Sequence, residues 1–102
     1  MTLNEYIKGL PWGEKITLRY SINSKERTFG TYVVTPDYTI RAIDGERVIT
    51  EFNKLRVKEA YAYQDRMIVV LAVGTVWLGE HKKWQKRNKM PPQKSLEELN
   101  TI

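Results

Sequence analysis

The chain contains no cysteine and a single histidine, His81. The lack of cysteine excludes disulfide bonds and thiolate metal sites, and it fits a reducing compartment such as the cytoplasm. One histidine cannot form a histidine pair for a metal ion, and no serine nucleophile stands at a recognisable spacing from it. We therefore expect a protein that is not an enzyme and that holds no metal ion or cofactor.

Long apolar runs are absent as well. The longest run, from Met67 to Val73, is far shorter than the roughly 20 residues that cross a bilayer as a helix. The first residues, Met1 to Glu5, lack the basic and apolar character of a signal sequence. We therefore expect a cytoplasmic protein that does not enter a membrane.

The positive charge is concentrated near one end of the chain. The 102 residues have a net charge of +5. Residues 1–75 contain 11 Lys and Arg and 9 Asp and Glu, whereas residues 76–102 contain 6 Lys and Arg and 3 Asp and Glu. Most of the second excess lies in residues 81–89, before two consecutive prolines that end any helix. The sequence therefore predicts a domain over residues 1–75 and a basic, partly helical tail over residues 76–102.

Residues 1–50 have the pattern of a short helix followed by strands. Thr2 and Glu5 have the spacing of a helix-capping box. Apolar and polar residues then alternate strictly from residue 16 to residue 22, which predicts a half-buried strand. A second run, at 28–35, contains Gly30, where we expect a bend, a bulge or a close backbone approach. The Asp44-Gly45 pair predicts a hairpin that places Ile40 opposite Ile49.

Two longer strands are expected at 55–63 and 67–73. Glu59 falls on the apolar side of the first strand, so we expect it either at an open edge or, by preference, paired with Arg19 or Arg41. The second strand is apolar on both sides and should be central or covered on both faces.

Two stretches within this plan resemble known small barrels. Residues 29–33, followed by 36–40, look like the Sm-type pattern of a bent glycine strand and an acidic turn. Residues 34–36 with 52–57 are similar to strand endings of WYL-type barrels, and YolD-like proteins share the general plan. The resemblance covers residues 3 to about 73. It implies a mainly β fold: a small SH3-like or Sm-like antiparallel barrel of five to six strands, with a short N-terminal helix and a C-terminal helical tail.

A helix over residues 76–88 would have an aromatic side and a basic side. Trp77, His81 and Trp84 fall on one face. The tryptophans could pack the helix on the open end of the barrel while the lysines are merely solvated. Alternatively, the basic side could bind phosphates of RNA or single-stranded DNA, with salt-dependent affinity. His81 itself is expected to be a solvated tail residue.

The first functional hypothesis is a non-enzymatic nucleic-acid-binding accessory or regulatory protein. The basic residues that we expect to contact nucleic acid are Lys82, Lys83, Lys86, Arg87 and Lys89, with Arg56 and Lys58 from a strand as a second contact. Five tyrosines, namely Tyr20, Tyr32, Tyr38, Tyr61 and Tyr63, could supply a stacking platform for bases.

The second hypothesis is a protein-binding inhibitor or adaptor, for example a phage or mobile-element factor that blocks a host protein. Its contacts would come from an unpaired strand edge or from the tail, with Trp77, Trp84, Leu96 and Leu99 as partner-binding residues. The same features leave a homo-oligomer open.

Overall fold

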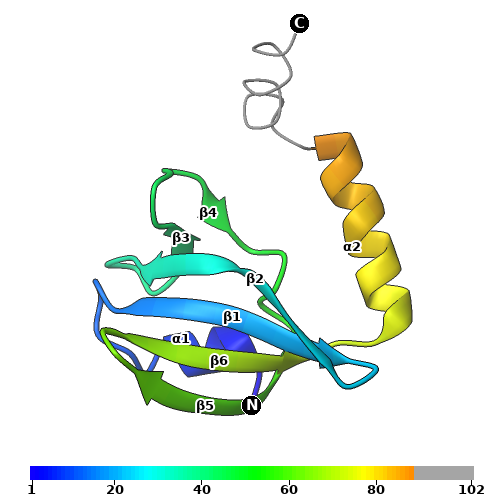
Figure 1. The fold of residues 1–102 in the computed structure, drawn as a ribbon. Helices are drawn as coiled ribbons and strands as arrows, with labels where there is room; N and C mark the ends of the chain where they lie inside the picture. Colours follow the sequence, from blue (N-terminus) through cyan, green and yellow to red (C-terminus); the bar gives the residue numbers. More distant parts are fainter. Residues whose placement is uncertain (89–102) are drawn as a thin grey trace, which may run out of the picture.

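The computed structural model describes residues 1–88, with side chains for residues 1–86, and it confirms a mainly β fold (Figure 1). The elements in chain order are α1 (Leu3–Ile7), β1 (Lys15–Ile22), β2 (Lys25–Val34), β3 (Ile40–Ala42), β4 (Val48–Ile49), β5 (Arg56–Tyr63), β6 (Arg66–Ala72) and α2 (Thr75–Asn88).

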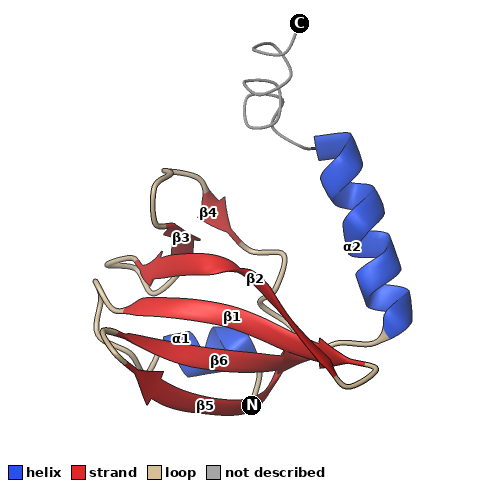
Figure 2. Ribbon diagram, in the orientation of Figure 1, coloured by secondary structure: helices blue, strands red, loops and turns tan. Residues whose placement is uncertain are grey.

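The six strands form one mixed, strongly twisted sheet (Figure 2). Their order is β4-β3-β2-β1-β6-β5, and every pair is antiparallel except β1 with β6, which is parallel. The expectation of a wholly antiparallel sheet is therefore wrong at this pair. The cause is the β5–β6 hairpin, which places β5 at the edge and returns β6 alongside β1 in the same direction.

A closed barrel is not confirmed, because β4 and β5 are the two edges of the sheet and do not pair with each other. The central position of β6, in contrast, is confirmed. Its residues Ile68, Val69, Val70 and Leu71 are all buried, as a strand with neighbours on both sides and apolar residues on both faces should be.

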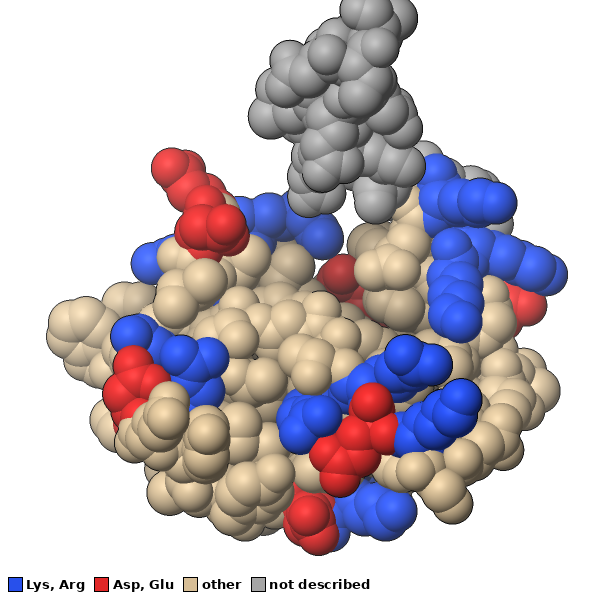
Figure 3. Space-filling view, viewed as in Figure 1, with Lys and Arg blue, Asp and Glu red and all other residues tan. Residues whose placement is uncertain are grey.

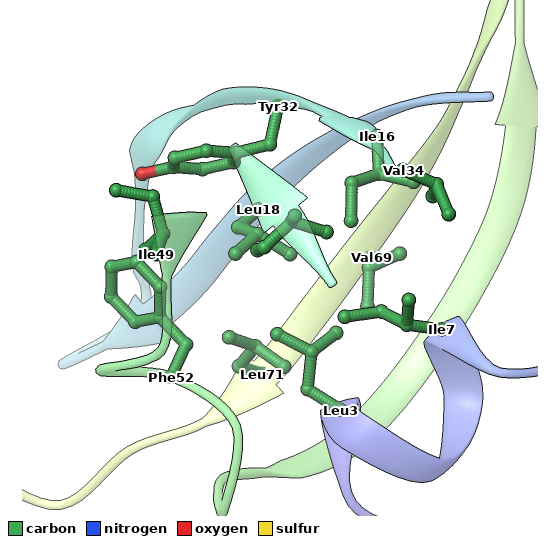
Figure 4. Close-up of a cluster of buried hydrophobic side chains, with 11 residues drawn as sticks. Leu3, Ile7, Ile16, Leu18, Tyr32, Val34, Ile49, Phe52, Val69 and Leu71 are labelled. Carbon is green, nitrogen blue, oxygen red and sulfur yellow. The ribbon is translucent and has the colours of Figure 1, made fainter. Parts of the chain in front are cut away.

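Helix α1 covers the middle of one face of the sheet. It begins with the predicted capping box: the Thr2 backbone N–H donates to Glu5 Oε1 at 2.8 Å, and the Glu5 N–H donates to Thr2 Oγ1 at 3.3 Å. Leu3 and Ile7 are fully buried and point toward β6 (Figure 4). A five-residue helix has little stability of its own, so this packing holds it in place.

The bend at Gly30 is a β-bulge. Leu18 pairs with Gly30 but Arg19 pairs with Thr28, so Phe29 is an extra residue in β2. A Cβ atom at Gly30 would lie 3.0 Å from Tyr32 Oη, which explains the absence of a side chain there. The extra residue Phe29 stacks on Tyr20, with ring centroids 4.4 Å apart.

A second bulge in β5 explains the position of Glu59. Val57 pairs with Leu71 and Glu59 pairs with Val70, so Lys58 is the extra residue and the alternation changes sides. Glu59 is exposed on this edge strand, as one of the two expected arrangements required. The preferred pairing with Arg19 or Arg41 is wrong. Arg19 Nη1 lies 2.9 Å from Glu26 Oε1, and Arg41 Nη1 donates to the carbonyls of Ala42 (3.2 Å) and Gly45 (2.9 Å).

The turns set the register largely as predicted. Ile40 pairs with Ile49, which confirms the register predicted from Asp44-Gly45. The two-residue turn is not formed, because the strands end at Ala42 and begin again at Val48, so five residues connect them. The five polar residues 23–27 would suit a loop, but Asn23 and Ser24 both adopt positive φ (52° and 62°). This geometry makes a two-residue hairpin turn, and β2 therefore already begins at Lys25.

Candidate functional site

Helix α2 stands beside the sheet, just past the end of β6 (Figure 1). It spans Thr75–Asn88, which confirms the predicted helix. Its first turn begins at Gly74, two residues after β6 ends, where the Leu78 N–H donates to the Gly74 carbonyl at 3.0 Å. The division of the chain at residue 75 stays a prediction.

The side of α2 that faces the sheet carries a ladder of stacked rings. The His81 ring lies 4.8 Å from the Trp77 ring at an interplanar angle of 11°, and 5.9 Å from the Trp84 ring at 14°. The guanidinium of Arg47 continues the ladder, with its Cζ atom 5.8 Å from the Trp84 ring. We call these four side chains the α2 ladder. Its spacing follows from the helix repeat, which places residues four and three apart on one face.

Two phenylalanines connect the α2 ladder to the core. Phe29, the extra residue of the β2 bulge, lies edge-on to Trp77 at 5.9 Å and to His81 at 5.8 Å. Phe52, which follows β4, lies 5.4 Å from His81 and 4.7 Å from Phe29. These contacts fix the rotation of α2 about its axis, since turning the helix would remove the rings from each other.

His81 is buried, with 7% of its surface exposed, so the expectation of a solvated tail residue is wrong. The neighbouring rings replace water around it. Burial lowers the pKa of His81 below its ordinary value, and the Glu51 carboxylate opposes this shift only in part. Among the described residues its Nε2 atom has no hydrogen-bond partner. The imidazole therefore packs as a neutral ring rather than as a charged surface group.

An open cleft of about 280 Å³ lies between α2 and the segment that follows β4. Its lining residues are Glu51, Trp77, Glu80, His81 and Trp84. Figure 3 shows a hollow between α2 and the part of the molecule that carries β3 and β4. The Glu51 side chain is only 15% exposed, and its Oε2 atom lies 3.4 Å from Nη2 of Arg47.

The opposite side of α2 is basic. Lys82, Lys83 and Lys86 are all exposed, and they fall on the turn positions that point away from His81. Blue side chains gather on this outer side of the helix in Figure 3. Lys83 also lies 4.0 Å from Glu80, a loose contact between two mainly exposed side chains. The structure therefore brings three of the predicted nucleic-acid residues together.

Arg56 and Lys58 lie at the other end of the helix. Arg56 pairs with Ala72, which comes shortly before α2 begins, whereas the lysines follow about 10–16 Å further along the helix axis. Both residues are exposed. They form a separate basic group near the N-terminal end of α2 and do not belong to its outer side.

Sequence reasoning missed two basic residues of the β1–β2 hairpin. Lys25 and Arg27 are exposed, and Arg27 lies two positions before Phe29, which contacts Trp77 and His81. The contacts of Phe29 place this hairpin near the first turns of α2, some fifty residues away in the chain (Figure 1). No local sequence pattern indicates this proximity, because it depends on where α2 packs.

The tyrosine platform is not formed. Tyr20 and Tyr32 are each 8% exposed and belong to the interior, and burial raises the pKa of Tyr32 to about 12. Tyr61 and Tyr63 are exposed on the edge strand β5, and Tyr38 is exposed in a turn. The five rings therefore do not share one surface.

Some predicted residues are not described. Lys89, Leu96 and Leu99 lie outside residues 1–88, and Arg87 is described only as part of the α2 backbone. Within the described part of the chain, no cluster of three or more acidic or histidine side chains could hold a metal ion. No helix in this part is both long and apolar enough to cross a membrane.

No known protein family matches the chain, and searches among curated proteins and solved structures also gave no match.

Proposed function

We propose that this protein is a non-enzymatic module that binds nucleic acid through the basic outer side of α2. One observation carries the proposal. The α2 ladder holds the aromatic side of the helix against Phe29 and Phe52, so Lys82, Lys83 and Lys86 are presented together to solvent.

The charges of this surface are suited to a phosphate backbone. Lysine side chains are compact, strongly hydrated cations that contact phosphates without reading base sequence. Lys82 and Lys86 lie one turn apart on the same stripe of the helix, and Lys83 is exposed beside Lys82. We expect weak sequence specificity and an affinity that falls steeply with salt.

The test is the binding of a fluorescently labelled single-stranded oligonucleotide, followed by anisotropy at several salt concentrations. The variant K82Q/K86Q removes two charges from the outer side of α2. The matched control K8Q/K54Q removes two charges from exposed lysines elsewhere. We expect the first variant to bind about tenfold more weakly and to lower the salt slope by roughly 1.4, since each phosphate contact to a single strand contributes about 0.7.

Two results would contradict the proposal. One is the absence of any binding at low salt by the unmodified protein. The other is an equal loss in K82Q/K86Q and K8Q/K54Q, which would show a response to net charge rather than to this surface. A duplex of the same sequence, measured in parallel, tells whether the site prefers single strands.

A second function, binding of a protein, is favoured by the edge strand β5. Its first residues also contact the N-terminal segment, through a bridge of Arg56 with Thr2 and a hydrogen bond from the Val57 N–H to the Met1 carbonyl at 2.9 Å. Residues 59–63 pair with β6 alone among the described strands, and Tyr61 and Tyr63 are exposed there. An unpaired edge of this length can accept a strand from another chain. Capture of a partner that survives nuclease and high salt, and that is lost when proline replaces Ala60, would support this function over the first.

A further inference from the structure

The cleft beside α2 has the size and shape of a site for one side chain. Its volume of about 280 Å³ lies just below the range of pockets for small molecules. One wall is formed by the edges and faces of the Trp77, His81 and Trp84 rings, and Glu51 forms the other wall. The indoles offer apolar surface that a chain of methylene groups can cover.

The polar groups of this cleft are acidic. Glu51 and Glu80 both line it, and the described lining contains no lysine or arginine. The Glu51 side chain is 15% exposed, so water screens its charge little, and Arg47 Nη2 at 3.4 Å offsets this charge only from the outside. The lining itself offers no cation to a phosphate. A cation with an apolar stem matches both the carboxylates and the rings.

The molecule already shows how such a cation would be held. The guanidinium of Arg47 lies 5.8 Å from the Trp84 ring and its Nη2 atom 3.4 Å from Glu51 Oε2. The Arg47 side chain is 57% exposed, so it contacts the rim of the cleft without filling it. A guanidinium stacks on rings and pairs with carboxylates better than an ammonium group does, because it is flat and more weakly hydrated.

We propose that this cleft binds the arginine side chain of a partner protein. The guanidinium contacts Glu51 and Glu80, and the methylene stem lies along Trp77 and Trp84. This site is separate from the basic outer side of α2, and it goes beyond the proposed binding of nucleic acid.

The test is a titration of the ¹⁵N-labelled protein with the peptide acetyl-Gly-Arg-Gly-amide, followed by the indole N–H resonances of the three tryptophans. Trp77 and Trp84 line the cleft, and Trp12, which is 67% exposed elsewhere, serves as the internal reference. We expect saturable shifts at Trp77 and Trp84 and none at Trp12. The lysine peptide should bind roughly threefold more weakly, and the citrulline peptide, which is uncharged, should not bind.

Two variants locate the site. E51Q should weaken binding of the arginine peptide by about fivefold, because it removes the most enclosed carboxylate without changing the shape of the side chain. Its matched control is E46Q, an exposed glutamate outside the cleft, which should leave the affinity unchanged. Should E51Q fail to fold, E80Q tests the same point, since Glu80 is mainly exposed on α2 and its replacement cannot disturb the core.

Three results would overturn the inference: equal binding of the citrulline and arginine peptides, shifts spread equally over all three indoles, or shifts at Trp84 produced by a nucleoside monophosphate but not by the peptide. The last result would assign the cleft to a base.

The two proposals can be contradicted independently of each other. E51Q should leave binding of the oligonucleotide intact, and K82Q/K86Q should leave binding of the arginine peptide intact.

Discussion

The two helices meet the sheet in different ways. Helix α1 packs through Leu3 and Ile7, which are completely buried, and backbone hydrogen bonds from Leu3 to Leu55 (2.8 Å) and from Asn4 to Asn53 (3.1 Å) tie it to the chain before β5. Helix α2 packs through Leu78, which is 8% exposed, and through the rings of Trp77 and His81, and it leaves an open cleft beside these rings.

This difference separates the helix that belongs to the core from the helix for which we propose binding. Leu3 and Ile7 of α1 both belong to the hydrophobic core, so this helix is part of the core. On α2, one side is fixed by rings, the other side presents lysines, and the cleft lies between the helix and Glu51. The two binding surfaces that we propose on and beside α2 therefore both depend on how this helix is held.

The largest loss of stability should follow from a cavity in the contact between α1 and the sheet. Leu3→Ala removes a fully buried side chain between α1 and β6. We expect the free energy of unfolding to fall by about 3 kcal/mol, through lost burial and the cavity that remains. Urea denaturation measures this change. Val76→Ala, at a position that is 80% exposed on α2, is the control and should change the free energy by less than about 0.5 kcal/mol.

A loss below about 1 kcal/mol in Leu3→Ala would contradict the view that α1 is part of the core. It would mean that α1 detaches readily, and the contrast between the two helices would then be lost.

A smaller effect should follow from breaking the α2 ladder. Trp77→Ala removes the ring that lies against both Phe29 and His81. Because Trp77 is only partly buried, we expect a loss of about 2 kcal/mol, less than for a fully buried tryptophan. Amide hydrogen exchange should rise in α2 while β1 and β6 stay protected, since the helix can detach without unfolding the sheet.

The control for this change is Trp12→Ala, which removes the same side chain from a position that is 67% exposed. It should leave both the stability and the exchange of α2 unchanged. If Trp77→Ala instead raised exchange throughout the sheet, α2 would be an integral part of the core, as α1 is.

Local signals in the sequence predicted the parts of the fold that depend on local geometry. The capping box of Thr2 and Glu5, the Asp44-Gly45 turn and the two-sided apolar run of β6 each specify their own neighbourhood. The parallel pairing of β1 with β6 could not be predicted in this way, because it depends on where the β5–β6 hairpin docks.

The candidate site shows the same limit. The spacing of Trp77, His81 and Trp84 predicted a shared face, and the structure stacks these rings on each other. The cleft was not predicted, because its other wall comes from Glu51 in a distant part of the chain. The burial of His81 was missed for the same reason: Phe29 and Phe52 reach it only through the β2 bulge and the turn after β4.

The smallest effect should be the pH dependence that His81 gives to the contact of α2. Burial lowers its pKa in the folded protein, with Glu51 opposing the shift, so below about pH 6.5 the unfolded chain takes up a proton that the folded chain does not. Stability should therefore fall as the pH is lowered from 7.5 to 5.5, before most carboxylates titrate. His81 is the only histidine, so His81→Phe, which keeps a ring between Trp77 and Trp84, should flatten this slope in urea denaturation at the two pH values. An equal slope in the variant would show that the pH dependence does not come from His81, and a gain in stability on acidification would show that the ladder accepts a protonated imidazole beside Glu51, Glu80 and Arg47.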